Sequence, residues 1–443
     1  MADVRVQVLL FLAMYVLLAV EYHRFVYPNY SYIMGFDLCW RPLAVVTGVV
    51  MVAAAVWALW SGALTTNGGA SCAATLVGVL FFLPSVVMYQ FGGTTAAIPL
   101  YSLLLVALLS FNFQLVRHAH HKSSAGHRPF FNFQFPRVPR RWVRWVLPLV
   151  TLAAMLPFPL TFGWHPDLSL FAMGEETYQV REACGAQGNV FTAYLMGPLR
   201  LVLLPMMVVM GLKDFRRDWW MAVAGGAGMM ALYLMVPQKS IFFSLAVVVA
   251  FFLWEDYGTK RGFFLLMITL VCGLTVLLHA VGGMLMPESI AVRRLFFIPV
   301  IVGDNYFTFF DGHPMLLSHS FLSRWFEYPY TVEPSRLIGE MMYWRTNINC
   351  NTGVVADGFM NFGHAGALLF VAGAAVFIRL VSSQLRDPRC FGLVALLVLT
   401  MLNSALFTTL LTHGGLALLL AGCFLELGSS ENRRSTTLWS QRR

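Results

Sequence analysis

The chain has 443 residues, of which 58% are hydrophobic and 12% are charged, and its mean hydropathy is +0.69. A soluble domain carries about twice that share of charge, roughly 25%. So little charge cannot cover a water-exposed surface, which excludes a soluble enzyme, a disordered tail and a nucleic-acid-binding module. We predict a polytopic integral membrane protein of the all-α class, with residues 1–443 forming one membrane domain.

Apolar runs along the chain predict about twelve membrane-spanning helices packed as a bundle. The first run lacks the basic start and the small-residue cleavage site of a signal peptide, so we expect it to be retained as a helix. The predicted spans cover 6–26, 43–60, 73–91, 96–116, 145–163, 190–212, 219–237, 240–254, 262–285, 363–380, 391–407 and 414–427.

Basic residues give the orientation. The formal net charge is +9, and about twenty of the 30 Lys and Arg residues fall on one side of the predicted spans. Because such residues collect on cytoplasmic loops, we expect both termini to be cytoplasmic. Two long segments, 164–189 and 286–362, then lie outside. The second is too polar to cross a bilayer but rich in aromatic residues, so we expect it to be partly helical at the membrane surface.

Ten basic residues depart from this inside bias, and four of them are candidates for an anion site: Arg200, Lys239, Arg293 and Arg294. Arg200 interrupts the apolar run 190–212, where a charge costs at least ~2.5 kcal/mol. The alternatives are a snorkelling or ion-paired Arg200, a simple turn residue at Lys239, and lipid phosphate binding by Arg293 and Arg294. Together the four would suit a lipid-linked phosphate or pyrophosphate.

Candidates for proton transfer lie in the same outer segment. Asp304, Asp311 and His313 fall within ten residues of one another, with Tyr306 between them. Asp357 and Asn361 precede a helix start at Gly363. Each of these residues taken alone also fits a solvated loop or a helix cap. His279, in the middle of an apolar run, is more typical of a packed histidine than of a catalyst.

The seven cysteines show no CxxC spacing, which argues against a metal framework. The histidines of 117–122 lack a neighbouring carboxylate or thiol and fit a basic cytoplasmic anchor. Cys184 and Cys350 both fall in predicted outer loops, and a disulfide between them is a hypothesis from that shared oxidising side.

Two stretches of this sequence resemble the Wzy-type O-antigen polymerases. One is Arg294-Leu-Phe-Phe-Ile-Pro299 leading into Asn305-Tyr-Phe-Thr-Phe-Phe310, followed by His313-Pro314 and Ser318-His-Ser320. The other is Asn351-Thr-Gly-Val-Val-Ala-Asp-Gly-Phe-Met-Asn-Phe-Gly363-His-Ala-Gly366. The turn Gln238-Lys239-Ser240 and the layout of many helices with two large outer loops also agree, whereas the first 140 residues add only hydropathy.

The resemblance implies a C-type, membrane-embedded glycosyltransferase of the bacterial inner membrane, working at its periplasmic face without metal or cofactor. It would move a growing glycan from undecaprenyl pyrophosphate to the non-reducing end of a new lipid-linked repeat unit. Arginines would then stabilise the leaving pyrophosphate. The family usually shares chain-length control with a separate regulator protein. On this basis the residues expected to contact the glycan are Tyr306, Asn351, Asp357 and Asn361.

Three other functions remain open. An O-antigen ligase would usually carry a His-Asn pair before the Gly-x-x-Gly helix start, where this chain has Asn349-Cys-Asn351. A flippase or transporter of lipid-linked sugars would tend to show repeated halves and broken midplane helices. A membrane-bound acyltransferase using His279 or His413 is a third possibility, although neither histidine sits in a recognisable motif.

Overall fold

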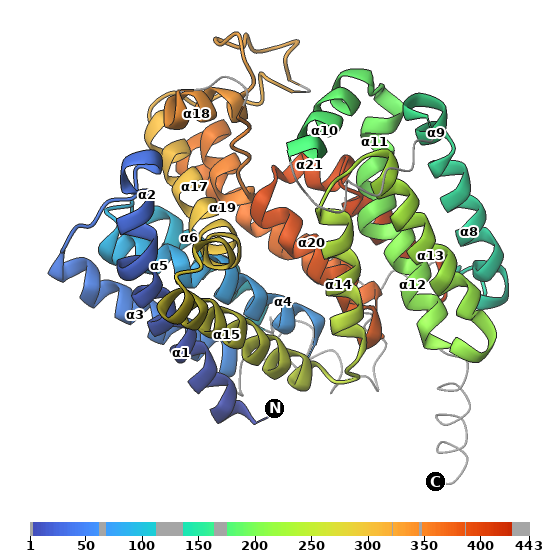
Figure 1. Cartoon of the computed structure of the whole chain (residues 1–443), viewed down its shortest axis with the longest axis horizontal. Helices are drawn as coiled ribbons and strands as arrows, with labels where there is room; N and C mark the ends of the chain where they lie inside the picture. Colours follow the sequence, from blue (N-terminus) through green and yellow to red (C-terminus); the bar gives the residue numbers. More distant parts are fainter. Residues whose placement is uncertain are drawn as a thin grey trace, which may run out of the picture. The chain divides into compact units, whose positions relative to one another are not determined.

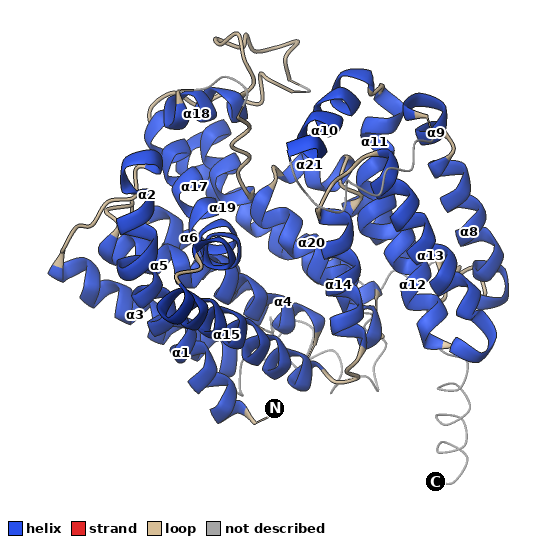
Figure 2. Ribbon diagram, viewed as in Figure 1, coloured by secondary structure: helices blue, strands red, loops and turns tan. Residues whose placement is uncertain are grey.

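The computed structural model describes residues 3–61, 68–111, 136–163, 175–320, 322–344, 348–385 and 387–427. Across these residues the secondary structure is helical, and the only strand-like pairing is an isolated bridge between Val138 and Leu425 (Figure 2). The predicted all-α class is confirmed. The end of the predicted span 96–116, the first part of 164–189, the anchor at 117–122 and the C-terminal tail lie outside the described residues.

Seven helical segments in this part of the chain are long and apolar enough to cross a membrane, and four shorter apolar helices accompany them. A membrane protein with transmembrane helices is therefore confirmed, whereas the count of twelve crossings stays a prediction. The seven segments are Val4–Met34, Pro42–Trp60, Gly69–Phe91, Arg140–Phe162, Val190–Lys213, Tyr257–Gly282 and Val354–Gln384.

The chain divides into two compact units, each assembled from three separate stretches (Figure 1). Unit 1 comprises Met1–Pro129, Asp256–Arg379 and Val398–Leu406. Unit 2 comprises Phe130–Glu255, Leu380–Leu397 and Phe407–Arg443.

Unit 1 is built around one buried segment, Gly69–Phe91, whose apolar window is enclosed along its whole length. Its first turns carry small residues, which allow neighbouring helices to approach closely. Gln90 ties this segment to its neighbours, since its amide accepts from Tyr15 at 2.8 Å and donates to the Val45 carbonyl at 3.1 Å. The helices of unit 1 are α1 (Val4–Glu21), η1 (Tyr22–Val26), α2 (Tyr27–Met34), α3 (Pro42–Trp60), α4 (Gly69–Val77), η2 (Gly78–Phe82), α5 (Leu83–Phe91), α6 (Ala97–Ser110), α15 (Tyr257–Gly282), α16 (Leu285–Glu288), η5 (Ser289–Phe297), α17 (Ile298–Phe309), α18 (Pro334–Tyr343) and most of α19 (Val354–Gln384).

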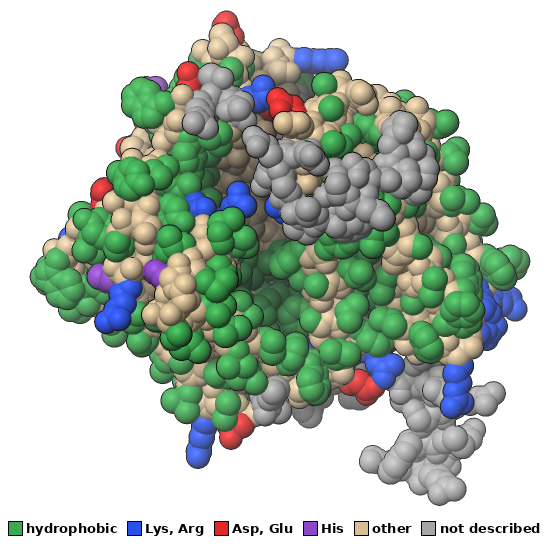
Figure 3. All heavy atoms as spheres, in the orientation of Figure 1, with side chains coloured by type: hydrophobic (Ala, Val, Ile, Leu, Met, Phe, Trp, Pro, Cys, Tyr) green, Lys and Arg blue, Asp and Glu red, His purple; other side chains and the backbone are tan. Residues whose placement is uncertain are grey.

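Other helices turn apolar side chains outward. On α15 the exposed residues Leu270, Leu274, Leu277 and Val281 repeat every three or four positions, which lines up one face of the helix. Hydrophobic side chains also cover much of the face shown in Figure 3. An outward apolar stripe is the pattern expected of a helix that meets lipid.

Unit 2 is held together by close helix contacts at small residues. A Cβ at Gly211 would overlap Ala222, and one at Gly225 would press on the Leu204 carbonyl, so both glycines let α12 and α13 approach. The helices of unit 2 are α8 (Arg140–Met155), α9 (Pro157–Phe162), α10 (Glu175–Gln187), α11 (Val190–Pro198), η4 (Leu199–Leu203), α12 (Leu204–Lys213), α13 (Phe215–Met235), α14 (Ser240–Phe252), η6 (Pro388–Cys390), α21 (Leu406–Leu411) and α22 (Gly415–Phe424), with the first half of α20 (Phe391–Asn403).

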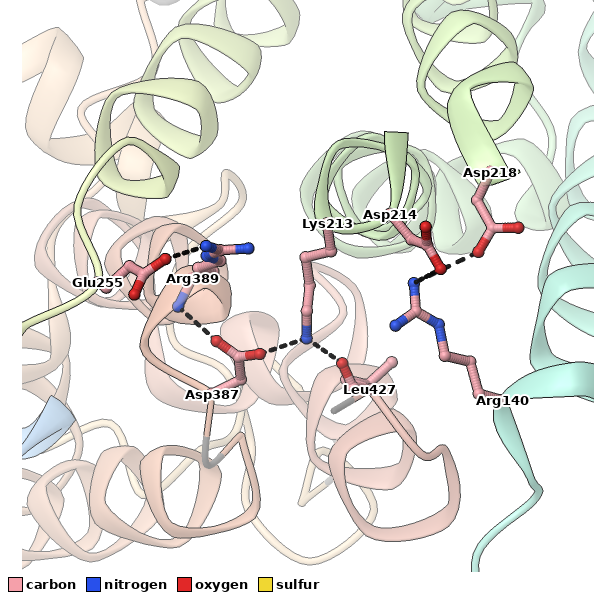
Figure 4. A network of polar contacts seen from close by, with 8 residues as sticks. All are labelled: Arg140, Lys213, Asp214, Asp218, Glu255, Asp387, Arg389 and Leu427. Atoms are coloured by element: carbon pink, nitrogen blue, oxygen red, sulfur yellow. Dashed lines mark hydrogen bonds and ion pairs between the residues drawn. The ribbon is translucent and has the colours of Figure 1, made fainter. Parts of the chain in front are cut away.

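Ionic contacts connect several helix ends within unit 2 (Figure 4). The Lys213 ammonium is paired with Asp387 and donates to a backbone carbonyl, while Asp387 also accepts from the Arg389 N–H at 2.9 Å. The sequence predicts Lys213 and Arg389 on the cytoplasmic side, and in the structure both connect loops to helix termini. The other pairs drawn in the figure are Arg389 with Glu255, and Arg140 with Asp214 and Asp218.

The segment 286–362 contains α16, η5, α17 and α18, so it is partly helical, as expected. The element α19 (Val354–Gln384) consists of two helices that meet at the non-helical residues Phe362 and Gly363, where Gly363 has φ +61. A helix therefore starts at Gly363, as predicted, and a shorter helix that the sequence did not predict precedes it from Val354. Glycine adopts this left-handed conformation without the steric cost that a side chain adds.

Candidate functional site

Arg200 lies on the π-helical stretch η4, between two prolines of unit 2, Pro198 and Pro205. A π-helical stretch within an α-helix is often found at functional sites. The guanidinium Nη1 donates to the side chain of Gln238 and, at 2.7 Å, to the hydroxyl of Ser240. The turn before α14 therefore holds this arginine in place with neutral groups.

Arg200 has no ion-pair partner among the described carboxylates, and its Nε is buried without a hydrogen-bond partner. Arg181, exposed on α10, is near enough to add a second positive charge to its surroundings. A cation in a water-poor site normally pairs with a carboxylate or faces a ligand. The contacts of Arg200 thus leave a positive charge available to an anion.

His413 lies beside this arginine, between α21 and α22. Its Nδ1 is buried without a partner, and burial together with the charge of Arg200 lowers the pKa of His413 to about 4. The chain here packs tightly on α11, because a Cβ at Gly197 would overlap the backbone of Thr412 and His413. On α21, the hydroxyl of Thr409 is also buried without a partner. Arg200, Thr409 and His413, all in unit 2, thus each have a buried polar atom without a hydrogen-bond partner.

Lys239 immediately precedes α14 and is exposed. It is adjacent in sequence to both neutral partners of Arg200, so the turn Gln238-Lys239-Ser240 belongs to the same part of unit 2. The interpretation of this turn as part of an anion site stays a prediction, now with a structural link to Arg200.

Arg293 and Arg294 lie in unit 1 on η5. Arg293 is half-buried: its Nε donates to the Ser289 hydroxyl at 3.1 Å, and its guanidinium carbon lies 4.2 Å from the centre of the Tyr30 ring. Burial lowers the pKa of Arg293 from its ordinary value. Arg294 is exposed. Because these two belong to unit 1 and Arg200 and Lys239 belong to unit 2, one cluster of all four cations stays a prediction.

Among the base candidates, Asp304 has the most defined geometry. Its Oδ1 accepts from the backbone N–H of Thr95 at 2.9 Å and from the Thr95 hydroxyl at 3.0 Å. Burial raises the pKa of Asp304, and the two bonds from Thr95 oppose that shift. Asp311 and His313 are exposed in the turn after α17, with His313 Nδ1 2.9 Å from the Asp311 carbonyl oxygen.

The residues expected to contact glycan differ in exposure. Asn351 is exposed, whereas Tyr306 is buried and donates its hydroxyl to the Cys350 carbonyl at 3.0 Å. Asp357 and Asn361 are buried and bonded to each other, with Asn361 Nδ2 donating to Asp357 Oδ1 at 3.0 Å. These bonds give the three buried residues structural roles. Contact with a glycan stays a prediction for all four.

Sequence reasoning noted the turn Gln238-Lys239-Ser240 but did not predict that Gln238 and Ser240 contact Arg200. It missed Thr95 and Thr409, and considered His413 only for an acyltransferase. Thr95 and Asp304 are 209 residues apart, so no local motif could join them. His413 and Thr409 stand out because their polar atoms are buried without a partner. Burial of this kind is seen in the structure and not in the sequence.

Within the described part of the chain, no group of three or more His, Cys, Asp or Glu side chains could hold a metal ion. All seven cysteines are free thiols, which corrects the hypothesis of a bridge between Cys184 and Cys350. Cys184 Sγ instead donates to the Met235 carbonyl, 3.4 Å away in unit 2, and Cys350 belongs to unit 1.

Comparison of the chain with protein-family models, with curated proteins and with solved structures finds no match.

Proposed function

We propose that this chain polymerises lipid-linked oligosaccharide repeat units. It would transfer the growing glycan from undecaprenyl pyrophosphate to the non-reducing end of a new undecaprenyl-pyrophosphate-linked unit. In this proposal the chain lies in the bacterial inner membrane with about twelve spans and cytoplasmic termini. Segments 164–189 and 286–362 then face the periplasm, and a separate regulator sets the chain length. Its support is the motif resemblance together with the surroundings of Arg200.

The observation that carries the proposal is the contact set of Arg200. A guanidinium interrupts an apolar helix, is held by Gln238 and Ser240, and has no ion pair among the described residues. Keeping such a charge in a membrane helix costs at least ~2.5 kcal/mol. A pyrophosphate bound there would offset that cost, because guanidinium binds phosphate oxygens with two parallel hydrogen bonds.

The reaction needs the charge that this site supplies. The bond between the anomeric carbon of the growing glycan and a pyrophosphate oxygen breaks, and a hydroxyl oxygen of the acceptor sugar forms the new glycosidic bond. Negative charge develops on the leaving pyrophosphate, and a cation held in place before the reaction stabilises it without reorganising. In the proposal Arg200 and Lys239, with Arg293 and Arg294, share this task.

The acceptor hydroxyl must also lose its proton, which requires a base. Asp304 suits that role because Thr95 fixes its carboxylate and burial raises its pKa above its ordinary value. A base works best when its pKa lies near the working pH. Asp311 and His313 stay alternative bases in this proposal.

The test is a lipopolysaccharide gel from a host that lacks this gene. Complementation with the wild-type chain should restore a ladder of O-antigen bands. The empty host, and a host with Arg200→Ala, should show core carrying a single repeat unit. Removing one transition-state donor typically costs about 100-fold or more in rate, so the ladder should disappear. Arg216→Gln, an exposed arginine on α13, is the matched control and should restore the ladder.

Other gel patterns would contradict the proposal. Loss of every O-antigen band, with long polymer accumulating on undecaprenyl pyrophosphate, would indicate a ligase. Accumulation of unpolymerised lipid-linked units on the cytoplasmic face would indicate a flippase. A full ladder from Arg200→Ala, at wild-type protein levels in the membrane, would reject the anion site at Arg200.

A further inference from the structure

Three titratable side chains lie close together in unit 1, where α1 passes into η1 and where α15 ends. Glu21 is the last residue of α1, His279 lies in the last turn of α15, and Glu288 ends the short helix α16. Two of them are almost fully enclosed, with exposed fractions of 1% for Glu21 and 2% for Glu288. The function proposed above uses none of these residues.

Glu288 has a basic partner, whereas Glu21 has none within the described residues. Glu288 Oε2 is ion-paired with His279 Nδ1, and the Phe25 ring covers the imidazole edge-on at 5.5 Å. Both carboxyl oxygens of Glu21, by contrast, are buried and receive no donor from the protein. The polar group within hydrogen-bonding reach of Glu21 is the carboxyl of Glu288, itself an acceptor when ionised.

This arrangement contains one basic side chain for two acids. Glu288 is paired with His279, whereas Glu21 has no basic partner among the described ion pairs. A second carboxylate at Glu21 would then be buried next to a like charge without any donor. Like charges this close in a water-poor site are not both ionised, and an unpaired buried charge is far more costly than a neutral acid.

A single proton removes both the repulsion between the two carboxylates and the lack of a hydrogen-bond donor at Glu21. On Glu21 it cancels the charge and turns one carboxyl oxygen into an O–H donor for Glu288. We propose that Glu21 and Glu288 form a proton-binding site that holds one proton between their carboxyl groups, with His279 as the basic partner of Glu288. The proton comes from water through His279, the most exposed of the three, and returns by the same route.

The site also adjoins the candidate anion-binding arginines of unit 1. Glu288 is followed directly by Ser289, whose hydroxyl accepts from Arg293 Nε. Loss of the shared proton would therefore add a negative charge at the junction between α16 and η5. The titratable or charged residues next to the pair in sequence, or on η5, are Tyr22, His23, Arg24, Arg293 and Arg294, and Cys272 of α15 interacts electrostatically with Glu21.

The experiment is infrared spectroscopy of the full chain in lipid nanodiscs. Its glutamates carry a ¹³C-labelled carboxyl group, so that their bands separate from those of aspartic acids. At neutral pH we expect one labelled band of a protonated carboxyl, where exposed glutamates show only carboxylate. Glu21→Gln should abolish this band. Glu340→Gln, an exposed residue of α18, is the matched control and should keep it.

Two further variants keep the test decisive if Glu21→Gln does not fold. Glu288→Gln removes the like charge and frees His279 for Glu21, so the band should titrate at lower pH than in the wild type. His279→Gln removes the basic partner of Glu288, so the band should persist to higher pH. The proposal is overturned if the wild type shows no protonated glutamic acid at neutral pH. It is also overturned if the band survives in Glu21→Gln, or if neither of the other variants moves its titration.

Discussion

Asp357 Oδ2 accepts a hydrogen bond of 2.8 Å from the backbone N–H of Leu406, which joins the start of α19 to the start of α21. The same carboxylate accepts from Asn361, and Asn361 Oδ1 in turn accepts from the Leu317 N–H at 3.0 Å. The pair Asp357–Asn361 therefore holds two distant segments of unit 1 against one helix. An acid expected to bind glycan has a clear structural role.

The first prediction tests whether Asp357 supports the fold, as distinct from binding glycan. Asp357→Ala should lower the free energy of unfolding by about 1–3 kcal/mol, because it leaves buried donors on Leu406 and Asn361 unsatisfied. Asn351→Ala, at an exposed position of the same motif, should leave the free energy of unfolding unchanged. Thermal unfolding of the purified variants measures both. Equal midpoints for the two variants would show that Asp357 does not support the fold.

The second prediction concerns the charge of Arg200. Gln238→Glu places a carboxylate on the partner that Arg200 already contacts, so an internal ion pair should replace the open anion site. We expect inorganic pyrophosphate to raise the thermal midpoint of the wild type but not of this variant, and the O-antigen ladder to be lost. Gln187→Glu, exposed on α10, is the control. A pyrophosphate response that survives Gln238→Glu would mean that the anion binds elsewhere.

The third prediction tests Asp304 as the base. Thr95→Val deletes the hydroxyl that donates to Asp304 Oδ1 while keeping the backbone N–H bond. Losing this donor should raise the pKa of Asp304 further, because the hydroxyl stabilises the carboxylate. A base must be deprotonated to act, so the acid limb of the polymerisation rate should move to higher pH. Thr308→Val is a fitting control, since the Thr308 hydroxyl donates to the main-chain carbonyl of Asp304. An acid limb that stays in place would point to Asp311 or His313.

The fourth prediction follows from the low pKa of His413. In the folded chain it is about 4, whereas its ordinary value is 6.5. Between these values the unfolded chain binds a proton that the folded chain does not, so stability falls as the pH drops from 6.5 towards 4. We expect the thermal midpoint of the wild type to fall more steeply over this range than that of His413→Gln. The same substitution at the exposed His313 should leave the slope of the wild type unchanged.

Hydropathy predicts the helices well where one apolar run makes one helix. The run 43–60 corresponds to α3 at Pro42–Trp60, because a membrane helix needs about that length of apolar residues. Hydropathy finds the helix that starts at Gly363 but misses the short helix before it, since the polar residues Asp357 and Asn361 suggested a loop there. Both side chains are hydrogen-bonded inside the protein, so the segment from Val354 to the break at Phe362 is helical.

The candidate site was predictable only in part for a similar reason. A charge in an apolar run is visible in the sequence, so Arg200 could be singled out. Its partners Gln238 and Ser240 come from another helix, and the partner of Asp304 is 209 residues away. Pairings of this kind depend on how helices pack, which local sequence patterns do not encode.

The division of the chain into interleaved stretches bears on how the protein is made. Unit 1 takes its last stretch from Val398–Leu406, and unit 2 takes its last from Phe407 onwards. A ribosome releases the chain from its N-terminus, so neither unit can close until the final helices emerge. The early helices α4 and α5 contact α15, η5 and α17, which emerge much later, so unit 1 assembles in steps during synthesis. A premature stop before α20 removes the last stretches of both units together.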